Sequence, residues 1–181
     1  MTFHKLLIAN RGEIACRIIK TAHEMGIACV AVYTEADSYS PFVRMADQAI
    51  KLSDSYLNGN EIINAAKQTG AEAIHPGYGF LSENAKFARA VQKEGLIWVG
   101  PNSRVITSMG DKLKAKDIAE KAGVPTLPMT TDPKKANSIG YPILIKAAAG
   151  GGGKGMRIVE DKKDLKDCLL YTSPSPRDTL L

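Results

Sequence analysis

The chain has 181 residues and a net charge of +5, and its 44% hydrophobic and 24% charged content is ordinary for one globular domain or one and a half. This composition excludes disorder throughout, and no apolar run approaches the roughly 18 to 20 residues of a membrane span. The N-terminus has a short apolar stretch followed at once by charge, which is typical of a strand and not of a signal sequence. We therefore expect a cytoplasmic protein.

Apolar runs and helix-length amphipathic segments alternate over the first hundred residues. The pattern predicts strands over 5–9, 28–33, 73–75 and 97–99, and helices over 13–25, 60–69 and 84–94, with Asn60 and Ser82 as helix caps. Such alternation predicts an α/β fold with a doubly wound, mostly parallel, Rossmann-like sheet.

The chain changes character near residue 110, where we expect a domain boundary. A helix is predicted over 111–122, ended by Gly123, followed by a short helix over 134–139, a strand over 142–146 and a helix from 161 to 168. Residues 111–167 hold twelve basic and eight acidic side chains, which account for most of the surplus charge. Without interleaved aromatic residues or a long basic stripe, this surplus favours an anionic ligand such as ATP over nucleic acid.

The cysteines and histidines give no sign of a metal site by spacing. Cys16, Cys29 and Cys168 include no Cys-x-x-Cys pair, which argues against both a disulfide framework and a zinc site. His4, His23 and His75 are also too widely spaced to predict a cluster.

Two loops follow predicted strands at the edge where α/β sheets bind their ligands. The loop 10–13 lacks Gly-x-Gly-x-x-Gly, so no dinucleotide is expected there. The loop 75–84 carries an imidazole, an aromatic ring and a carboxylate. A tight turn alone explains its glycines and proline, but explains His75, Tyr78 and Glu83 less well.

The most informative segment is the glycine run 150–153, which follows a strand ending in Lys146. Successive glycine amides form an anion-binding nest, and Lys146 and Lys154 add positive charge. The segment fails the Walker pattern because no Ser or Thr follows Lys154, and the alternating residues 156–159 predict a second strand. We interpret it as a phosphate-binding hairpin, the alternative being a surface hairpin without a ligand.

Four segments together resemble the biotin carboxylase component of biotin-dependent carboxylases, most of all that of an acyl-CoA carboxylase acting on acetyl-, propionyl- or methylcrotonyl-CoA. The likeness extends from residue 3 to about 168, and the segments are 8–15, 75–84, 109–112 and 146–157. It implies a pre-ATP-grasp domain over 1–110 and the incomplete beginning of an ATP-grasp domain over 111–168. In that family, ATP and bicarbonate form carboxyphosphate, and its carboxyl group passes to biotin.

The resemblance also assigns roles to residues. It implies ATP contacts at Lys112, Lys146, Gly152, Gly153 and Met156, a lid containing Gly150, Gly151, Lys154 and Gly155, a biotin and bicarbonate vicinity at Tyr78, Gly79 and Glu83, and dimer contacts at Lys20 and Glu24. ATP, Mg²⁺, bicarbonate and biotin are the implied cofactors and substrates. A biotin carboxyl carrier domain, a carboxyltransferase subunit and a second copy of the chain are the implied partners, with no nucleic acid or membrane.

Residues 169–181 break the pattern and resemble translated sequencing-adapter read-through, so we expect them to be non-native. The resemblance places the family's magnesium-binding glutamates, bicarbonate-binding arginine and adenine-contacting strand after residue 168. It assigns no catalytic or metal-binding residue to this chain, and we expect the polypeptide alone not to turn over ATP.

The sequence also allows three other interpretations. Another ATP-grasp ligase, such as pyruvate carboxylase, carbamoyl phosphate synthase or a purine-pathway carboxylase, would share the lid, although the loop 75–84 argues against the last two. The second alternative is a non-catalytic nucleotide-binding or interaction module. A Rossmann oxidoreductase fits least, because the first strand lacks its glycine fingerprint.

Overall fold

The computed structural model describes residues 2–146 and 156–172. The chain divides into two compact units, Met1–Asp111 and Lys112–Leu181. In the described residues, no helix is long and apolar enough to cross a membrane.

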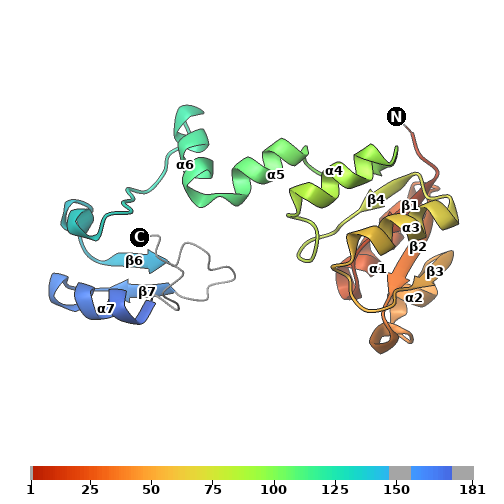
Figure 1. Ribbon diagram of the computed structural model, residues 1–181, viewed down its shortest axis with the longest axis horizontal. Helices are drawn as coiled ribbons and strands as arrows, with labels where there is room; N and C mark the ends of the chain where they lie inside the picture. The colour runs from red at the N-terminus through yellow and green to blue at the C-terminus, as the bar shows by residue number, and fades with distance from the viewer. Residues whose placement is uncertain (1, 147–155, 173–181) are drawn as a thin grey trace. The chain divides into compact units, whose positions relative to one another are not determined.

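The first unit is built on a five-stranded sheet in the order β3-β2-β1-β4-β5, with every neighbouring pair parallel (Figure 1). The strands are β1 Lys5–Ile8, β2 Ala28–Tyr33, β3 Gln48–Lys51, β4 Ala73–His75 and β5 Ile97–Trp98. This confirms the predicted α/β fold with a mostly parallel sheet. The strand β3 was not predicted, because it is an edge strand of sequence QAIK with only one partly buried residue.

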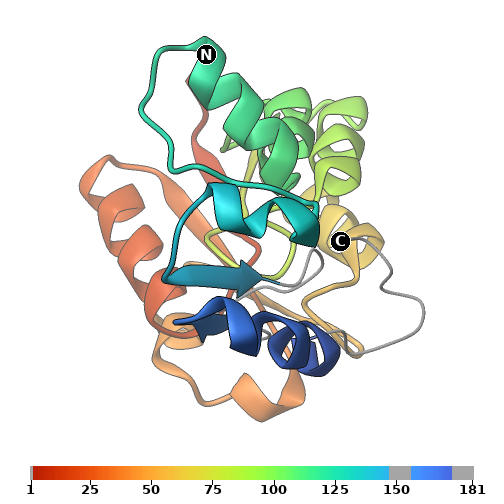
Figure 2. The ribbon, with the colours of Figure 1, turned by 90° about the vertical axis from the view of Figure 1, so that its left-hand side faces the viewer.

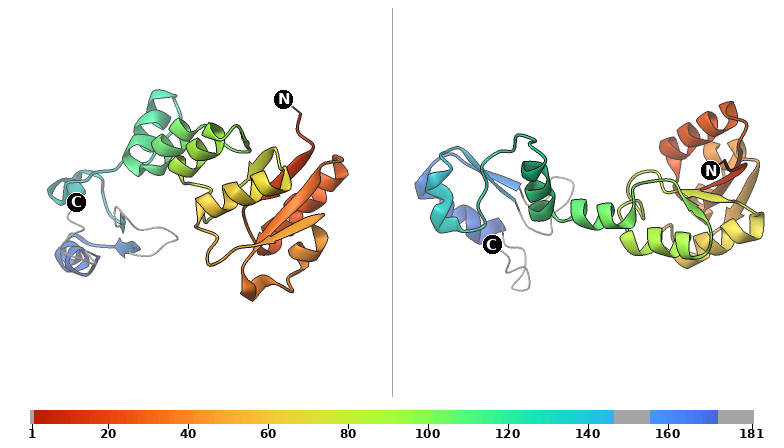
Figure 3. Two further views of the ribbon diagram at one scale, coloured as in Figure 1. Left: turned by 45° about the vertical axis from the view of Figure 1, so that its right-hand side comes forward. Right: turned by 90° about the horizontal axis from the view of Figure 1, so that it is seen from above.

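Helices cover both faces of this sheet, and each face has its own apolar core. One core joins Leu6 and Ile8 of β1 to α1 (Gly12–Glu24) and α2 (Pro41–Met45). The other joins Leu7 of β1 to α3 (Gly59–Thr69), α4 (Ala85–Lys93) and α5 (Ser103–Gly110). Successive β1 side chains therefore point to opposite helical layers, as the period of a strand requires, and Figure 3 shows the strands between these layers.

Two predicted helix caps are wrong by two residues. The side chain of Asn58, not Asn60, accepts the backbone N–H of Glu61 at the start of α3. At the start of α4, Asn84 rather than Ser82 caps the helix, and its carboxamide oxygen accepts two backbone N–H groups at 3.0 Å. In both segments the asparagine directly before the first helical residue accepts hydrogen bonds from the free amides of the first turn. Satisfying these amides is the physical requirement at the cap position.

The second unit contains α6 (Lys112–Lys121), a two-stranded antiparallel sheet of β6 (Ile143–Lys146) and β7 (Met156–Val159), and α7 (Leu165–Thr172). Figure 2 shows α7 beside this pair of strands, which it contacts. The predicted short helix at 134–139 is a 3₁₀ turn over Pro133–Ser138, and a second 3₁₀ turn, Lys162–Asp164, precedes α7. The strand predicted after the glycine run is present as β7.

Candidate functional site

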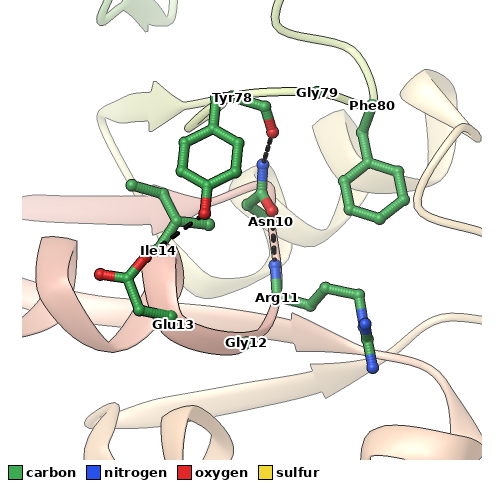
Figure 4. A pocket seen from close by; sticks show the side chains of 8 residues that line it. All are labelled: Asn10, Arg11, Gly12, Glu13, Ile14, Tyr78, Gly79 and Phe80. Carbon is green, nitrogen blue, oxygen red and sulfur yellow. Dashed lines mark hydrogen bonds between the residues drawn. The ribbon is translucent and has the colours of Figure 1, made fainter. Parts of the chain in front are cut away.

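The first unit has a hollow of about 370 Å³ at the carboxyl ends of β1 and β4. Parallel sheets bind ligands at this edge, because loops from several strands meet there. Two loops line it, and Figure 4 shows how their side chains lie. The lining residues are Asn10, Arg11, Gly12, Glu13, Ile14, Tyr78, Gly79 and Phe80.

Asn10 joins the two loops. Its side chain, in a residue only 2% exposed, donates hydrogen bonds to the backbone oxygens of Pro76 at 2.7 Å and Tyr78 at 2.8 Å. Its carboxamide oxygen accepts the backbone N–H of Arg11 at 2.9 Å. A buried amide with both ends paired fixes the loops against each other.

Gly77 allows this close approach. Its φ is +64°, and a Cβ at this position would lie 2.7 Å from Nδ2 of Asn10. Its backbone N–H donates to Nδ1 of His75 at 2.9 Å, so the neutral imidazole carries its proton on Nε2. Burial, and to a smaller extent the charge of Arg17, lowers the pKa of His75 and favours this neutral form.

A buried carboxylate holds the Arg11 side of the hollow. Asp37 is only 4% exposed, and it accepts hydrogen bonds from Nε and Nη2 of Arg11, the latter at 2.5 Å, and from the Tyr56 hydroxyl at 2.7 Å. The Arg11 guanidinium is the main reason that the pKa of Asp37 falls to about 2, and the carboxylate in turn raises the pKa of Arg11. Burial and the bond to Asp37 raise the pKa of Tyr56 to about 12. All three groups therefore keep their ordinary charge over a wide range of pH.

Aromatic side chains flank the hollow. The Tyr78 hydroxyl lies 3.3 Å from a carboxylate oxygen of Glu13, and Figure 4 shows this pair across the hollow from Phe80 and Arg11. The Phe80 ring packs on Tyr56 with centroids 5.2 Å apart. An exposed tyrosine, a carboxylate and an apolar ring offer a small polar ligand both stacking and hydrogen bonding.

The residues expected near biotin and bicarbonate fall into two hollows of the first unit. Tyr78 and Gly79 line the hollow described above, whereas Glu83 lines a neighbouring one of about 590 Å³. Phe80 lines both. The second hollow also contains two basic side chains, Lys86 and Arg89.

The residues expected to contact ATP belong to the second unit. Lys146 ends β6 and pairs in register with Met156, which begins β7, and both are exposed. Lys112 begins α6. The expected lid residues Gly150, Gly151, Lys154 and Gly155, and the expected ATP contacts Gly152 and Gly153, lie outside the described residues.

The network around Asp37 was not predicted from the sequence. Asp37 lies 26 positions after Arg11 and 19 positions before Tyr56, and it binds both side chains. The loop 10–13 was identified as unusual, but neither motif nor spacing points to residue 37. The expected dimer residues Lys20 and Glu24 are both exposed on α1.

Comparison with known proteins decides the family. Residues 2–106 match the model of the biotin carboxylase N-terminal domain, and residues 111–176 match that of the carbamoyl-phosphate synthase L chain ATP-binding domain. The chain belongs to the biotin carboxylase family. Its two matched regions follow the order expected from the sequence.

Relatives of this chain are subunits of several carboxylases. It is 54% identical over 176 residues to the mitochondrial methylcrotonoyl-CoA carboxylase subunit alpha of Dictyostelium discoideum, covering 90% of this chain and 25% of that one. It is 47% identical over 175 residues to the 2-oxoglutarate carboxylase small subunit of Hydrogenobacter thermophilus, covering 90% and 37%. The chain thus spans between a quarter and two fifths of the length of these relatives.

A solved structure gives the same result. The biotin carboxylase domain of the Hydrogenobacter thermophilus 2-oxoglutarate carboxylase, a dimer crystallised with MgADP, ADP and bicarbonate, is similar with a TM-score of 0.89 and 43% identity. The likeness covers 99% of this chain and 42% of that one. Campylobacter jejuni biotin carboxylase matches with a TM-score of 0.88, 43% identity, and coverage of 94% and 41%.

Proposed function

We propose that this chain forms the N-terminal part of a biotin carboxylase that carboxylates biotin at the expense of ATP, with bicarbonate as the carboxyl source. The first unit would be the pre-ATP-grasp domain and the second the beginning of the ATP-grasp domain. The observation that carries the proposal is the pair of family matches in the order that this enzyme requires. The strand-end loops of the first unit and the Lys146 strand pair of the second agree with it.

The proposed chemistry needs charge neutralisation more than covalent help. Transfer of a phosphoryl group to bicarbonate depends on positioning and on cations near the phosphate oxygens, and Mg²⁺ would supply part of that charge. Lys146 and Lys112 would bind phosphate oxygens as point charges. We assign no magnesium ligand among the residues of this chain.

The glycine-rich segment between β6 and β7 would close over the phosphates. Lys146 and Met156 are register partners, so the strands place both ends of that segment next to each other. A glycine backbone can turn several N–H groups toward one anion. Closure would also exclude water, which hydrolyses acyl phosphates such as carboxyphosphate.

The two neighbouring hollows of the first unit would lie near the carboxyl acceptor, biotin. Tyr78, Gly79 and Glu83 would lie near biotin and bicarbonate, and Asn10 would hold Tyr78 in place through its backbone oxygen. We further propose a cytoplasmic enzyme that works as a homodimer, with Lys20 and Glu24 at the contact, and with a biotin carboxyl carrier domain and a carboxyltransferase subunit as partners.

For the final acceptor we propose an acyl-CoA. Methylcrotonoyl-CoA and propionyl-CoA carboxylase subunits among the relatives support this choice. The 2-oxoglutarate carboxylase subunit of Hydrogenobacter thermophilus gives the second candidate, a keto acid. The carboxyltransferase partner would select between them.

A chimaera tests the proposed role of Lys146. Residues 1–168 replace the matching segment of the Hydrogenobacter thermophilus small subunit, and ATP hydrolysis is measured with and without bicarbonate. We expect hydrolysis that depends on bicarbonate and falls at least about tenfold in Lys146→Ala, because a charge-assisted phosphate contact is worth about 1.5–3 kcal/mol. The exposed Lys135 provides the matched control, and Lys135→Ala should change the rate less than about twofold. Equal rates in the two variants would contradict the assignment.

The 181-residue chain alone should show no bicarbonate-dependent ATP hydrolysis above its own Lys146→Ala variant, because its likeness covers only 42% of a solved biotin carboxylase domain. A clear difference between the two would refute this part of the proposal.

A further inference from the structure

A second group of chemically active side chains lies at the amino ends of the strands β2 and β3, opposite the strand ends that carry the hollow. His23, Cys29 and Asp47 each offer one ligand atom, and in the described residues these three atoms lie within 4.8 Å of one another. Nε2 of His23 is 3.0 Å from Oδ2 of Asp47. The same oxygen accepts the backbone N–H of Cys29 at 2.7 Å.

The fold brings these residues together from three elements. Cys29 is the second residue of β2, and Asp47 immediately precedes the parallel strand β3. The backbone N–H of Asp47 donates to the Cys29 oxygen at 3.0 Å, which fixes the two side by side. His23 lies in the last turn of α1, and the chain returns from it to β2 through a turn at Gly26, whose φ is +74°.

The chemistry of this group suits a borderline divalent metal. Thiolate, imidazole and carboxylate are the three side chains that bind zinc. A tetrahedral zinc ion with bonds of about 2.0 to 2.3 Å holds its ligand atoms about 3.3 to 3.6 Å apart. The histidine and aspartate atoms are already near that spacing, and the sulfur needs to approach by about 1.5 Å at most.

The three side chains differ in burial. Cys29 is fully buried and forms the floor, while the side chains of His23 and Asp47 are 40% and 52% exposed. Solvent therefore reaches the group from the side of His23 and Asp47, which gives a metal ion a way in.

We propose that His23, Cys29 and Asp47 form a binding site for Zn²⁺ or a similar divalent metal ion, with water as the fourth ligand. Binding replaces the hydrogen bond between His23 and Asp47 with two metal bonds. The S–H bond of Cys29 breaks, its electron pair goes to the metal, and the proton goes to water. The site lies at the amino ends of β2 and β3, so it is separate from the hollow at the carboxyl ends of β1 and β4 and independent of the proposed function.

Spacing in the sequence conceals this site. Residues 23, 29 and 47 match none of the short Cys and His repeats of zinc proteins, so their spacing predicts no metal cluster. Only the parallel pairing of β2 and β3 brings residue 47 to residue 29.

Cobalt absorption tests the proposal on the purified 181-residue chain. Titration with Co²⁺ should produce intense visible bands of tetrahedral cobalt and a near-ultraviolet thiolate-to-cobalt band, and Zn²⁺ should abolish both. Cys29→Ser should remove the thiolate band, whereas the matched control Cys16→Ser should keep it. No cobalt bands, or a thiolate band that persists in Cys29→Ser, would overturn the proposal.

His23→Ala keeps the experiment decisive if Cys29→Ser fails to fold. This exposed substitution should leave the circular dichroism spectrum unchanged and weaken Co²⁺ binding at least about tenfold, because even outer-shell partners of metal ligands are worth 10–100-fold. His4→Ala, at another exposed histidine, should leave binding unchanged. A folded His23→Ala protein with unaltered affinity would show that the three residues form only a structural hydrogen-bond cluster.

Discussion

The buried carboxylate of Asp37 makes a sharp prediction about stability. Asp37→Asn removes the negative charge and leaves one amide oxygen to serve donors on Arg11 and Tyr56. The new amide N–H₂ group would take the place of an oxygen that accepts from the Arg11 guanidinium, so two donors would face each other. We expect the variant to unfold more easily than the unmodified chain at neutral pH.

The pKa of Asp37 gives the size of the effect. A fall in pKa from 3.8 to about 2 means that the charged carboxylate stabilises the folded state by about 2 kcal/mol. Because the folded-state pKa is the lower one, this stabilisation is present in full above about pH 4 and is lost as the pH falls toward 2. Asp37→Asn should therefore lose about 2 to 3 kcal/mol at pH 7, and progressively less in acid.

Urea unfolding followed by tryptophan fluorescence measures this loss. The single tryptophan of the chain, Trp98, is buried in the first unit and reports on the unit that contains Asp37. Asp54→Asn, which removes the same charge at an exposed position, should change the free energy of unfolding by less than about 0.5 kcal/mol. A loss below 0.5 kcal/mol in Asp37→Asn, or a loss that does not shrink between pH 4 and pH 2.5, would refute the reasoning.

Two further predictions use the same unfolding assay. Gly77→Ala should cost about 2 kcal/mol or more, since the added Cβ would meet the side chain of Asn10 at 2.7 Å in a left-handed backbone. Gly79→Ala, with a similar φ of +68° but open space, should cost only about 1 kcal/mol, and equal losses would contradict the close contact. Asn84→Ala should lose about 1 kcal/mol by uncapping α4, while Ser82→Ala should be nearly neutral. A larger loss of stability in Ser82→Ala than in Asn84→Ala would show that Ser82 is the cap.

Buried apolar runs made the central strands predictable. The strands β2 and β4 begin and end where the sequence predicts, because their residues alternate between two covered faces and are almost wholly buried. The edge strand β3 and the five-residue helix α2 were missed, because a short or half-exposed segment carries too little pattern.

Polar contacts between distant residues were harder to predict from the sequence than strands and helices. The loops 10–13 and 75–84 were identified from their residue types, and the structure brings them to one hollow. The partner of Arg11 was not predictable from the sequence. Asp37 lies in the short turn after β2, and only the fold brings this turn next to Arg11. The same holds for Asp47 beside Cys29, since strand register and not sequence distance makes them neighbours.

Transfer of labelled bicarbonate to free biotin tests the central claim most directly. The chimaera of residues 1–168 with the remainder of the Hydrogenobacter thermophilus small subunit is incubated with ¹⁴C-bicarbonate, biotin and MgATP, and acid-labile carboxybiotin is counted. We predict carboxybiotin that requires ATP and is nearly abolished in Lys146→Ala but not in Lys135→Ala. A folded chimaera that forms no carboxybiotin, or that forms it equally without ATP, would contradict the account.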